Sequence, residues 1–217
     1  MTDIEILYAN EDLIAIHKKP GLPCQSRNRK ERTPLDRVFP KLLGENVTLL
    51  NRLDQPAGGI LLWQRPGKKN PDTSLKIKSK TYLAIVEGHP EKERATLRSF
   101  LRRDGRRRRA VEDRQKGKKA VMHYRLIHRF DRYSLLEVDL VTGRFHQIRK
   151  QLSDIGHPIR GDVKYGARRG HKDRSIDLHA LAYEIILRDQ ILNLQDVRVP
   201  DSPLWCQAKK QGLIPAR

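Results

Sequence analysis

Residues 142–149 read Thr-Gly-Arg-Phe-His-Gln-Ile-Arg, and the pattern of apolar residues differs on the two sides of this stretch. From here onward, apolar residues recur at helical spacing at Phe145, Ile148, Leu152 and Ile155. This spacing predicts a helix after Gly143 that ends at Gly156. Before the stretch, residues 120–128 and 133–141 are apolar runs of strand length, and they predict an antiparallel pair.

The rest of the chain contains more strand-like runs than helical ones. Strands are expected at residues 4–8, 13–16, 47–50, 59–63, 81–88, 178–187 and 191–199. Short helices are expected after Thr33-Pro34, with Thr33 as the N-cap, and after Pro203. Because strands dominate and the helices are short and interspersed, the sequence predicts an α+β domain with a mixed, mainly antiparallel sheet.

Length and composition exclude several classes of protein. The chain has 217 residues, enough for one large domain or two small ones. No apolar stretch approaches the roughly 18–20 residues that cross a bilayer, and the acidic first residues do not resemble a signal or transit peptide. Cys24 and Cys206 lie far apart, and the eight histidines form no cluster of metal-binding type. We therefore expect no disulfide framework, no metal site and a reducing, cytoplasmic location.

The charge favours a polyanionic partner. Lys and Arg number 45 against 26 Asp and Glu, which gives a net charge of +19. Such a surplus favours nucleic acid first and an anionic membrane surface second. Ten basic residues against three acids fall within residues 102–119, which reads as a basic insertion or loop. It is interpreted as a phosphate-binding arm, with a solvated loop as the alternative, and its candidate RNA contacts are Arg102, Arg103, Arg106, Arg107, Arg108 and Arg109.

Asp54 and Arg149 are the first candidates for chemistry. Asp54 lies in a Gly- and Pro-containing connection between two apolar strands, where an aspartate also serves simply to form a turn. A carboxylate that acts near neutral pH in a water-poor pocket needs a nearby cation to remain ionised. Arg149 adjoins the apolar face of the predicted helix, where an arginine is costly unless it has a carboxylate partner. The alternative is that its side chain extends past the helix to water.

Tyr82 is the third candidate. Its neighbours alternate as in a strand, so a core tyrosine with a hydrogen-bonded hydroxyl is the simplest interpretation. In a basic chain that binds RNA, a tyrosine ring also stacks on an extruded base, which is worth roughly 1–3 kcal/mol. The sequence alone leaves both interpretations open.

Three blocks together resemble a known family. They are residues 51–62 (NRLDQPAGGILL), residues 80–84 (KTYLA), and residues 142–149 (TGRFHQIR) with the following 156–162 and 165–166. In this order and at about this spacing they are similar to the blocks of the RluA-type family of RNA pseudouridine synthases. The similarity extends from about residue 4 to about residue 199 and includes a late block at residues 178–180.

The resemblance implies the pseudouridine synthase fold, as a single catalytic domain over residues 1–217. Many relatives carry a separate N-terminal RNA-binding domain, and we expect none here because the chain lacks room for it. It implies that the protein isomerises uridine to pseudouridine in ribosomal or transfer RNA, without cofactor or metal. Asp54 would be the catalytic aspartate, which attacks the sugar or removes a sugar proton. Arg149 would pair with Asp54, and Tyr82 would stack on the uracil.

Further residues are implied to bind the substrate. Ile148 would pack against the other side of the base, and Arg52 would fill the space around the vacated base position. His146 and Arg144, in the same block as Arg149, are expected to contact the substrate as well. We expect a monomer.

The sequence departs from the family pattern at two places next to Asp54. Asn51 stands where the family usually has His, and Pro56-Ala57 stands in place of Thr-Ser. These departures bear on the choice of substrate and on activity. The main alternative is a non-catalytic RNA- or ribosome-binding protein on the same fold, and a third interpretation is a membrane-surface protein.

Overall fold

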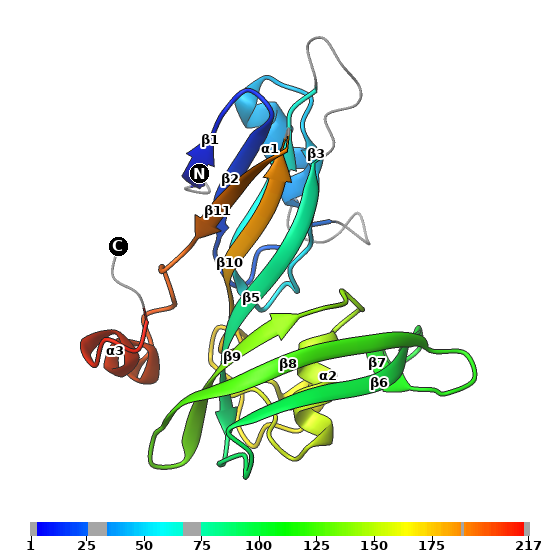
Figure 1. Ribbon diagram of the computed structural model, residues 1–217, viewed down its shortest axis with the longest axis vertical. Coiled ribbons are helices and arrows are strands. Elements are labelled where there is room, and N and C mark those ends of the chain that lie inside the picture. Colours follow the sequence, from blue (N-terminus) through cyan, green and yellow to red (C-terminus); the bar gives the residue numbers. More distant parts are fainter. Residues whose placement is uncertain (1–3, 26–33, 67–74, 188, 215–217) are drawn as a thin grey trace.

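The computed structural model describes residues 4–25, 34–66, 75–187 and 189–214, and in this part of the chain eleven strands form one sheet (Figure 1). The strands are β1 (Glu5–Ala9), β2 (Leu13–Lys18), β3 (Thr48–Leu49), β4 (Gly58–Gln64), β5 (Lys76–Glu87), β6 (Arg94–Asp104), β7 (Arg109–Glu112), β8 (Lys118–Arg129), β9 (Tyr133–Leu140), β10 (Leu178–Leu187) and β11 (Gln190–Gln195). The helices are α1 (Leu35–Leu43), α2 (Gln147–Asp154), α3 (Pro203–Lys210) and the short 3-10 helix η1 (Val163–Tyr165).

The sheet is mixed and mainly antiparallel, as predicted. Its main order is β1-β2-β4-β10-β5-β9-β8-β6-β7, while β11 pairs with β10 and β3 pairs with β4. The described strand pairs are antiparallel except β4 with β10, whose parallel contact covers Gly58 and Gly59 opposite His179 and Ala180. Strand β5 runs through both halves of the molecule (Figure 1), and it makes the sheet continuous because it pairs with β10 through residues 76–84 and with β9 through residues 81–87.

Alternation along β5 separates the two faces of the sheet. Tyr82 and Ala84 belong to the larger hydrophobic core, to which α2 contributes Ile148. Leu83 and Ile85 belong to a smaller core on the other face. That second core is covered by α3, whose Trp205 is completely buried and donates its indole N–H to Asp177 at 3.1 Å. One face of the sheet is therefore covered by α3, and the opposite face carries Tyr82 and α2.

The helix after Gly143 is shorter than predicted. His146 adopts a left-handed conformation, with φ of 51°, so α2 begins at Gln147 and Phe145 lies outside it. The Gln147 Oε1 atom accepts the Arg144 backbone N–H at 3.0 Å and thereby closes the turn that precedes the helix. At the other end, Ile155 follows the helix and is 36% exposed, so it is not a core residue.

Two further predictions differ from the structure or lie outside it. The last strand ends at Gln195 and not at residue 199 as predicted. Helix α1 is preceded by Pro34 as its N-cap, and Thr33 lies outside the described residues. The described helices include none long and apolar enough to cross a membrane.

The basic segment 102–119 is not a loop. It forms the end of β6, all of β7 and the start of β8, joined by turns at residues 105–108 and 113–117. Two aspartates stabilise these turns: Asp104 accepts the backbone N–H groups of residues 106 and 107, and Asp113 accepts those of residues 115 and 116. Leu101 is 3% exposed, so this end of the sheet also has a buried contact. The sequence indicates a loop because the charge of this segment is dense. The hydrogen bonds of its turns join residues two or three positions apart, and they leave no apolar pattern that would indicate strands.

Gly59 is expected to be essential for closing the sheet between β4 and β10. Its φ is +113°, and a Cβ atom there would lie 2.4 Å from the backbone nitrogen and oxygen of Ala180. Gly59→Ala should therefore lower the free energy of unfolding by about 3 kcal/mol, measured by urea denaturation. Gly105→Ala is the matched control, since a Cβ there meets nothing within 4 Å. Equal stabilities of the two variants would contradict this account.

Candidate active site

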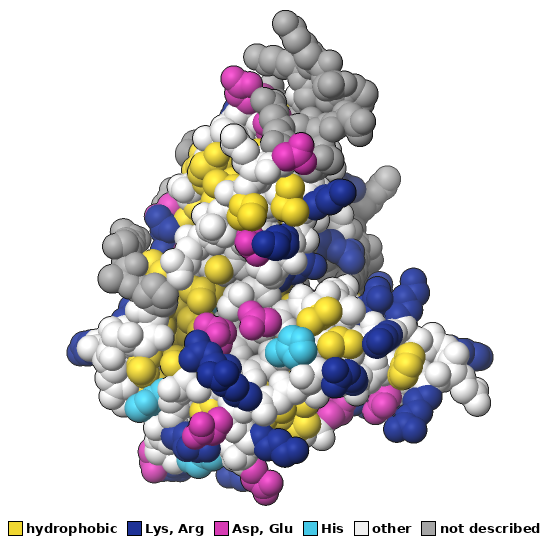
Figure 2. Space-filling view, in the orientation of Figure 1, with side chains coloured by type: hydrophobic (Ala, Val, Ile, Leu, Met, Phe, Trp, Pro, Cys, Tyr) yellow, Lys and Arg dark blue, Asp and Glu magenta, His cyan; other side chains and the backbone are white. Residues whose placement is uncertain are grey.

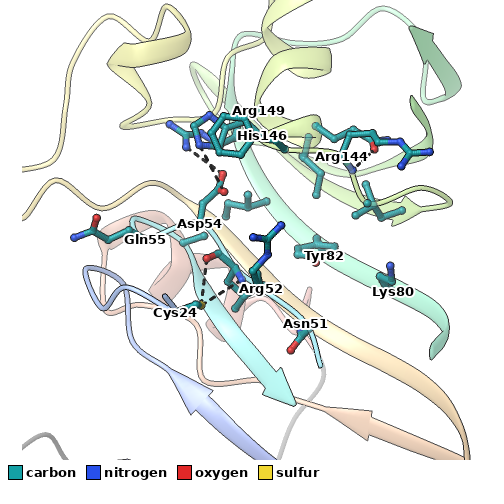
Figure 3. Close-up of a pocket in the computed structure, with 18 of the residues that line it drawn as sticks. Cys24, Asn51, Arg52, Asp54, Gln55, Lys80, Tyr82, Arg144, His146 and Arg149 are labelled. Atoms are coloured by element: carbon teal, nitrogen blue, oxygen red, sulfur yellow. Dashed lines mark hydrogen bonds and ion pairs between the residues drawn. The ribbon is translucent and has the colours of Figure 1, made fainter. Parts of the chain in front are cut away.

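All seven residues predicted to act on or bind the substrate line one cavity of about 610 Å³ (Figure 3). They are Asp54, Tyr82, Arg149, Arg52, Ile148, His146 and Arg144. The cavity lies on the face of the sheet opposite α3, since Tyr82 and Ile148 belong to the larger core. The segment before β4, the strand β5 and the start of α2 therefore meet here, although they are separated in sequence by up to 95 residues.

Asp54 is held by a turn whose backbone carbonyls all have partners. The Asp54 carbonyl accepts the Ala57 N–H at 3.0 Å, and the Pro56 carbonyl accepts the Ile176 N–H at 3.0 Å. The Gln55 carbonyl accepts the backbone N–H of residue 21 at 2.7 Å. The turn is thus fixed by its own hydrogen bond and by two separate parts of the chain, and the Asp54 side chain, 23% exposed, points into the cavity (Figure 3).

Lys18 stabilises this turn through hydrogen bonds to backbone carbonyls. It is completely buried, and its Nζ atom donates hydrogen bonds to the carbonyls of Ala57 at 2.7 Å, Lys19 at 3.1 Å and Gln55 at 3.2 Å. Burial lowers the pKa of Lys18 to about 8, although Cys24 and Asp54 act in the opposite direction. Three carbonyl acceptors match the three donors of an ammonium group.

Arg149 bridges two carboxylates. Its Nη1 atom donates to Asp54 Oδ2 at 3.0 Å, while Nε and Nη2 donate to the two oxygens of Asp162 at 2.6 and 2.8 Å. The Arg149 side chain is only 5% exposed, so it does not extend to water. Burial acts to lower the pKa of Arg149, but the hydrogen bonds and charges of Asp162 and Asp54 outweigh it and raise that pKa above its usual value. The guanidinium is therefore permanently charged and geometrically fixed.

His146 forms a second link between Asp54 and the edge of the sheet. Its Nε2 atom lies 3.7 Å from Asp54 Oδ1, and its Nδ1 atom is hydrogen-bonded to the Tyr165 hydroxyl at 2.8 Å. That hydroxyl also accepts the Ala110 backbone N–H at 2.6 Å. Burial raises the pKa of Tyr165 to about 12, so it remains protonated at neutral pH. His146 has a left-handed backbone conformation, and its ring lies beside Asp54.

The Tyr82 hydroxyl has a partner, as the simpler interpretation predicted. It lies 3.0 Å from the Tyr183 hydroxyl, which accepts the Asn51 Nδ2–H at 2.8 Å. Burial, followed by the neighbouring Tyr183, raises the pKa of Tyr82 well above its usual value. Asn51 also accepts the Leu62 N–H and donates to the Ile60 carbonyl, so it fastens the segment before Asp54 to β4. Thus the residue that replaces the family's usual His has a structural role here.

The other substrate-binding candidates surround this centre. Ile148 is 5% exposed and lies beside Arg149 at the start of α2. Arg52 is exposed, donates to Gln25 Oε1 at 3.3 Å and extends into the space between Asp54 and Tyr82 in the close-up (Figure 3). Arg144 lies at the end of the labelled cluster away from Asp54, and its Nε atom donates to the backbone carbonyl of residue 119 at 2.9 Å (Figure 3).

The six candidate RNA-contacting arginines divide into different groups. Arg108 lines the cavity itself and has a left-handed φ of 49°. Arg103 places its guanidinium carbon 5.1 Å from the centre of the Phe145 ring. Arg102 pairs with Asp113 at 2.6 Å. Arg106, Arg107 and Arg109 lie in and after the β6–β7 turn, an end of the molecule where Lys and Arg side chains gather (Figure 2).

Roles for Asp162 and Lys18 were not predicted from the sequence. A signal for Asp162 was available, because one carboxylate cannot satisfy the five N–H donors of a buried arginine. Lys18 offered a weaker signal, as a lysine at the end of an otherwise apolar strand. Within the described residues, no three His, Cys, Asp or Glu side chains are placed to hold a metal ion.

Comparison with known proteins identifies the family. The family model described as RNA pseudouridylate synthase matches residues 12–154, which include Asp54, Tyr82 and Arg149. The chain belongs to the RNA pseudouridylate synthase family. The resemblance stated from the three sequence blocks is thereby confirmed.

Individual relatives share part of their length with this chain. It is 33% identical over 174 residues to ribosomal large subunit pseudouridine synthase C of Rickettsia conorii, covering 74% of this chain and 56% of that protein. It is 29% identical over 226 residues to tRNA pseudouridine synthase C of Pectobacterium carotovorum, covering 96% and 59%. The chain therefore spans less than two thirds of the length of these curated relatives.

A solved structure shares the fold. Human RNA pseudouridylate synthase domain containing 4 superposes with a TM-score of 0.72 at 22% identity, covering 95% of this chain and 93% of that one. The similarity confirms the predicted pseudouridine synthase fold.

The Arg149–Asp162 pair is expected to be important for folding. Asp162→Asn leaves the buried Arg149 guanidinium with one carboxylate partner, the partly exposed Asp54. The substitution should lower the free energy of unfolding by about 3 kcal/mol. Asp54→Asn is the control, because Arg149 keeps both bonds to Asp162 and the loss should be about 1 kcal/mol. Urea denaturation of the three proteins measures both values. A cost for Asp54→Asn as large as that for Asp162→Asn would contradict this ranking.

Titration of Lys18 is expected to affect stability at alkaline pH. Its pKa is about 8 in the folded protein against an ordinary value of 10.5. Between these values the folded protein has lost a proton that the unfolded chain still holds, so this group makes the free energy of unfolding increase with pH. Relative to Lys18→Met, the free energy of unfolding of the wild type should rise by about 1–3 kcal/mol between pH 8 and 10.5 and should not change below pH 8. Urea denaturation of both proteins measures this difference. Parallel curves for the two proteins would rule out this titration.

Proposed function

We propose that the protein isomerises uridine to pseudouridine in structured RNA. The observation that carries this proposal is the Asp54 carboxylate at 3.0 Å from the buried Arg149 guanidinium, at one end of a cavity with an aromatic and cationic lining. Membership in the RNA pseudouridylate synthase family supports it. So do the names of the relatives, one of which refers to the ribosomal large subunit and another to tRNA.

In the proposed reaction, the bond between the sugar C1′ and uracil N1 breaks, the uracil rotates, and C1′ bonds to C5 instead. The proton on C5 leaves and N1 gains one, so product and substrate have the same composition. Asp54 acts on the sugar, either by attacking it or by removing one of its protons. Arg149 and the turn held by Lys18 fix the carboxylate in position, so that its oxygens do not have to reorganise as the bond breaks.

The target base must leave its stack to reach Asp54, at a cost of a few kcal/mol. We propose that the Tyr82 ring and Ile148 hold the extruded base, because both line the cavity and both present apolar surface to it. The Tyr82 hydroxyl is engaged with Tyr183, which leaves the ring as the part of Tyr82 available for contact. Arg52, which extends between Asp54 and Tyr82, occupies the region around the rotating base (Figure 3).

The basic residues of β6, β7 and their turns are proposed to bind the RNA backbone. Arg108 is best placed for this, since it lines the cavity in which the target nucleotide sits. Arg144 and His146 approach the same nucleotide from the start of α2. Each phosphate that such residues neutralise releases counterions, so affinity should fall steeply with salt.

The proposal is tested with purified protein and total RNA. Wild-type protein should create new pseudouridines at defined positions, and Asp54→Asn should create none while it binds RNA with an affinity within about twofold of wild type. Pseudouridine mapping by sequencing and a filter-binding titration provide the two measurements. Arg106→Ala, which removes one proposed backbone contact but no residue of the cavity, should retain the same modified positions. Binding without any new pseudouridine from the wild type would instead support the RNA-binding alternative.

A further inference from the structure

A second, smaller hollow of about 230 Å³ lies next to the cavity that holds Asp54. We call it the flanking niche, and its lining residues are Leu101, Arg102, Arg103, Lys116, Lys118, Arg144 and Phe145. Arg144 and Phe145 line both the cavity and the niche, so the two hollows share a wall. Building on the proposed function, we propose that the niche binds the base of a nucleotide adjacent to the target uridine.

The first argument is chemical complementarity. The niche combines two apolar residues, Leu101 and Phe145, with a rim of cationic side chains. Arg102 pairs with Asp113, but Arg103, Lys116 and Lys118 form no ion pair with any carboxylate in the described parts of the chain. The Arg103 guanidinium lies over the Phe145 ring and so offers a flat cationic surface beside these apolar residues. Such a surface inside a cationic rim matches a nucleotide, which joins a flat base to a phosphate.

The second argument is distance from the reacting centre. The Phe145 ring stacks on the His146 ring, with centroids 3.8 Å apart and planes inclined by 22°. His146 in turn lies 3.7 Å from Asp54. The niche is therefore separated from the catalytic carboxylate by one stacked pair of rings, a separation that neighbouring nucleotides of one strand can span.

The third argument is that the niche is preformed. Arg144 is tied at Nε to the backbone carbonyl of residue 119, and its own N–H is bonded to Gln147. The guanidinium of Arg103 lies over Phe145. Leu101 sits in the sheet, paired with Lys118 on one side and with Glu112 on the other. A site held by paired strands and by hydrogen-bonded residues at the start of α2 requires little ordering when the ligand binds.

The experiment compares three RNA hairpins that each carry a single uridine in the loop. One is intact, one has an abasic nucleotide on the 5′ side of the uridine, and one has it on the 3′ side. Asp54→Asn protein is titrated with each hairpin, so that the measurement does not depend on turnover. One of the two abasic hairpins should bind at least about fivefold more weakly than the intact hairpin. Phe145→Ala in the same background should remove that difference.

Matched variants separate base binding from phosphate binding. Arg106→Ala removes a charge outside the niche and should weaken all three hairpins equally, leaving the difference between them unchanged. Arg103→Gln should reduce the difference, and its thermal melting curve checks that the protein is folded. Equal affinities for the three hairpins, or a difference that persists in Phe145→Ala, would overturn the proposal.

The niche and the proposed function can fail separately. If wild-type protein makes no pseudouridine but Asp54→Asn discriminates between the hairpins, the activity is wrong and the nucleotide site stands. If pseudouridine forms and the hairpins bind equally, the activity stands and the niche does not bind a base.

Discussion

The site depends on one guanidinium placed between two carboxylates. Arg149 is almost completely buried, and it is retained there because Asp162 takes two of its N–H groups and Asp54 takes a third. The two acids have different surroundings: Asp162 is 1% exposed and Asp54 23% exposed. The same cation therefore binds tightly to a structural acid and orients a reactive one, which links the stability of the fold to the geometry of the cavity.

Much of this arrangement could be predicted from the sequence, because it follows from local rules. An arginine beside the apolar face of a helix needs an acidic partner, and Asp54, in a turn between two strands, was a suitable candidate for that partner. Alternation predicted β5, and with it the face on which Tyr82 lies. The mixed sheet followed from the number of strand-like runs and the short helices between them.

What could not be predicted depends on contacts between distant residues or on unusual backbone angles. Nothing near Lys18 in the sequence shows that its ammonium reaches carbonyls 37 and 39 residues away. The left-handed His146 is invisible to periodicity, so the predicted helix wrongly included Phe145. The 102–119 segment read as a loop from its charge, whereas its side chains project from strands and turns that are paired through the backbone.

The position of α3 has a consequence for how the cavity keeps its shape. The strand that presents Tyr82 to one face presents Leu83 and Ile85 to the other, and there they pack in the core that Trp205 fills. Helix α3 therefore supports β5 from the face opposite the cavity. It contributes no residue to the cavity lining, yet its packing resists movement of the strand that carries the Tyr82 ring. Residues some 120 positions apart in the chain thus share one mechanical task across the thickness of a single sheet.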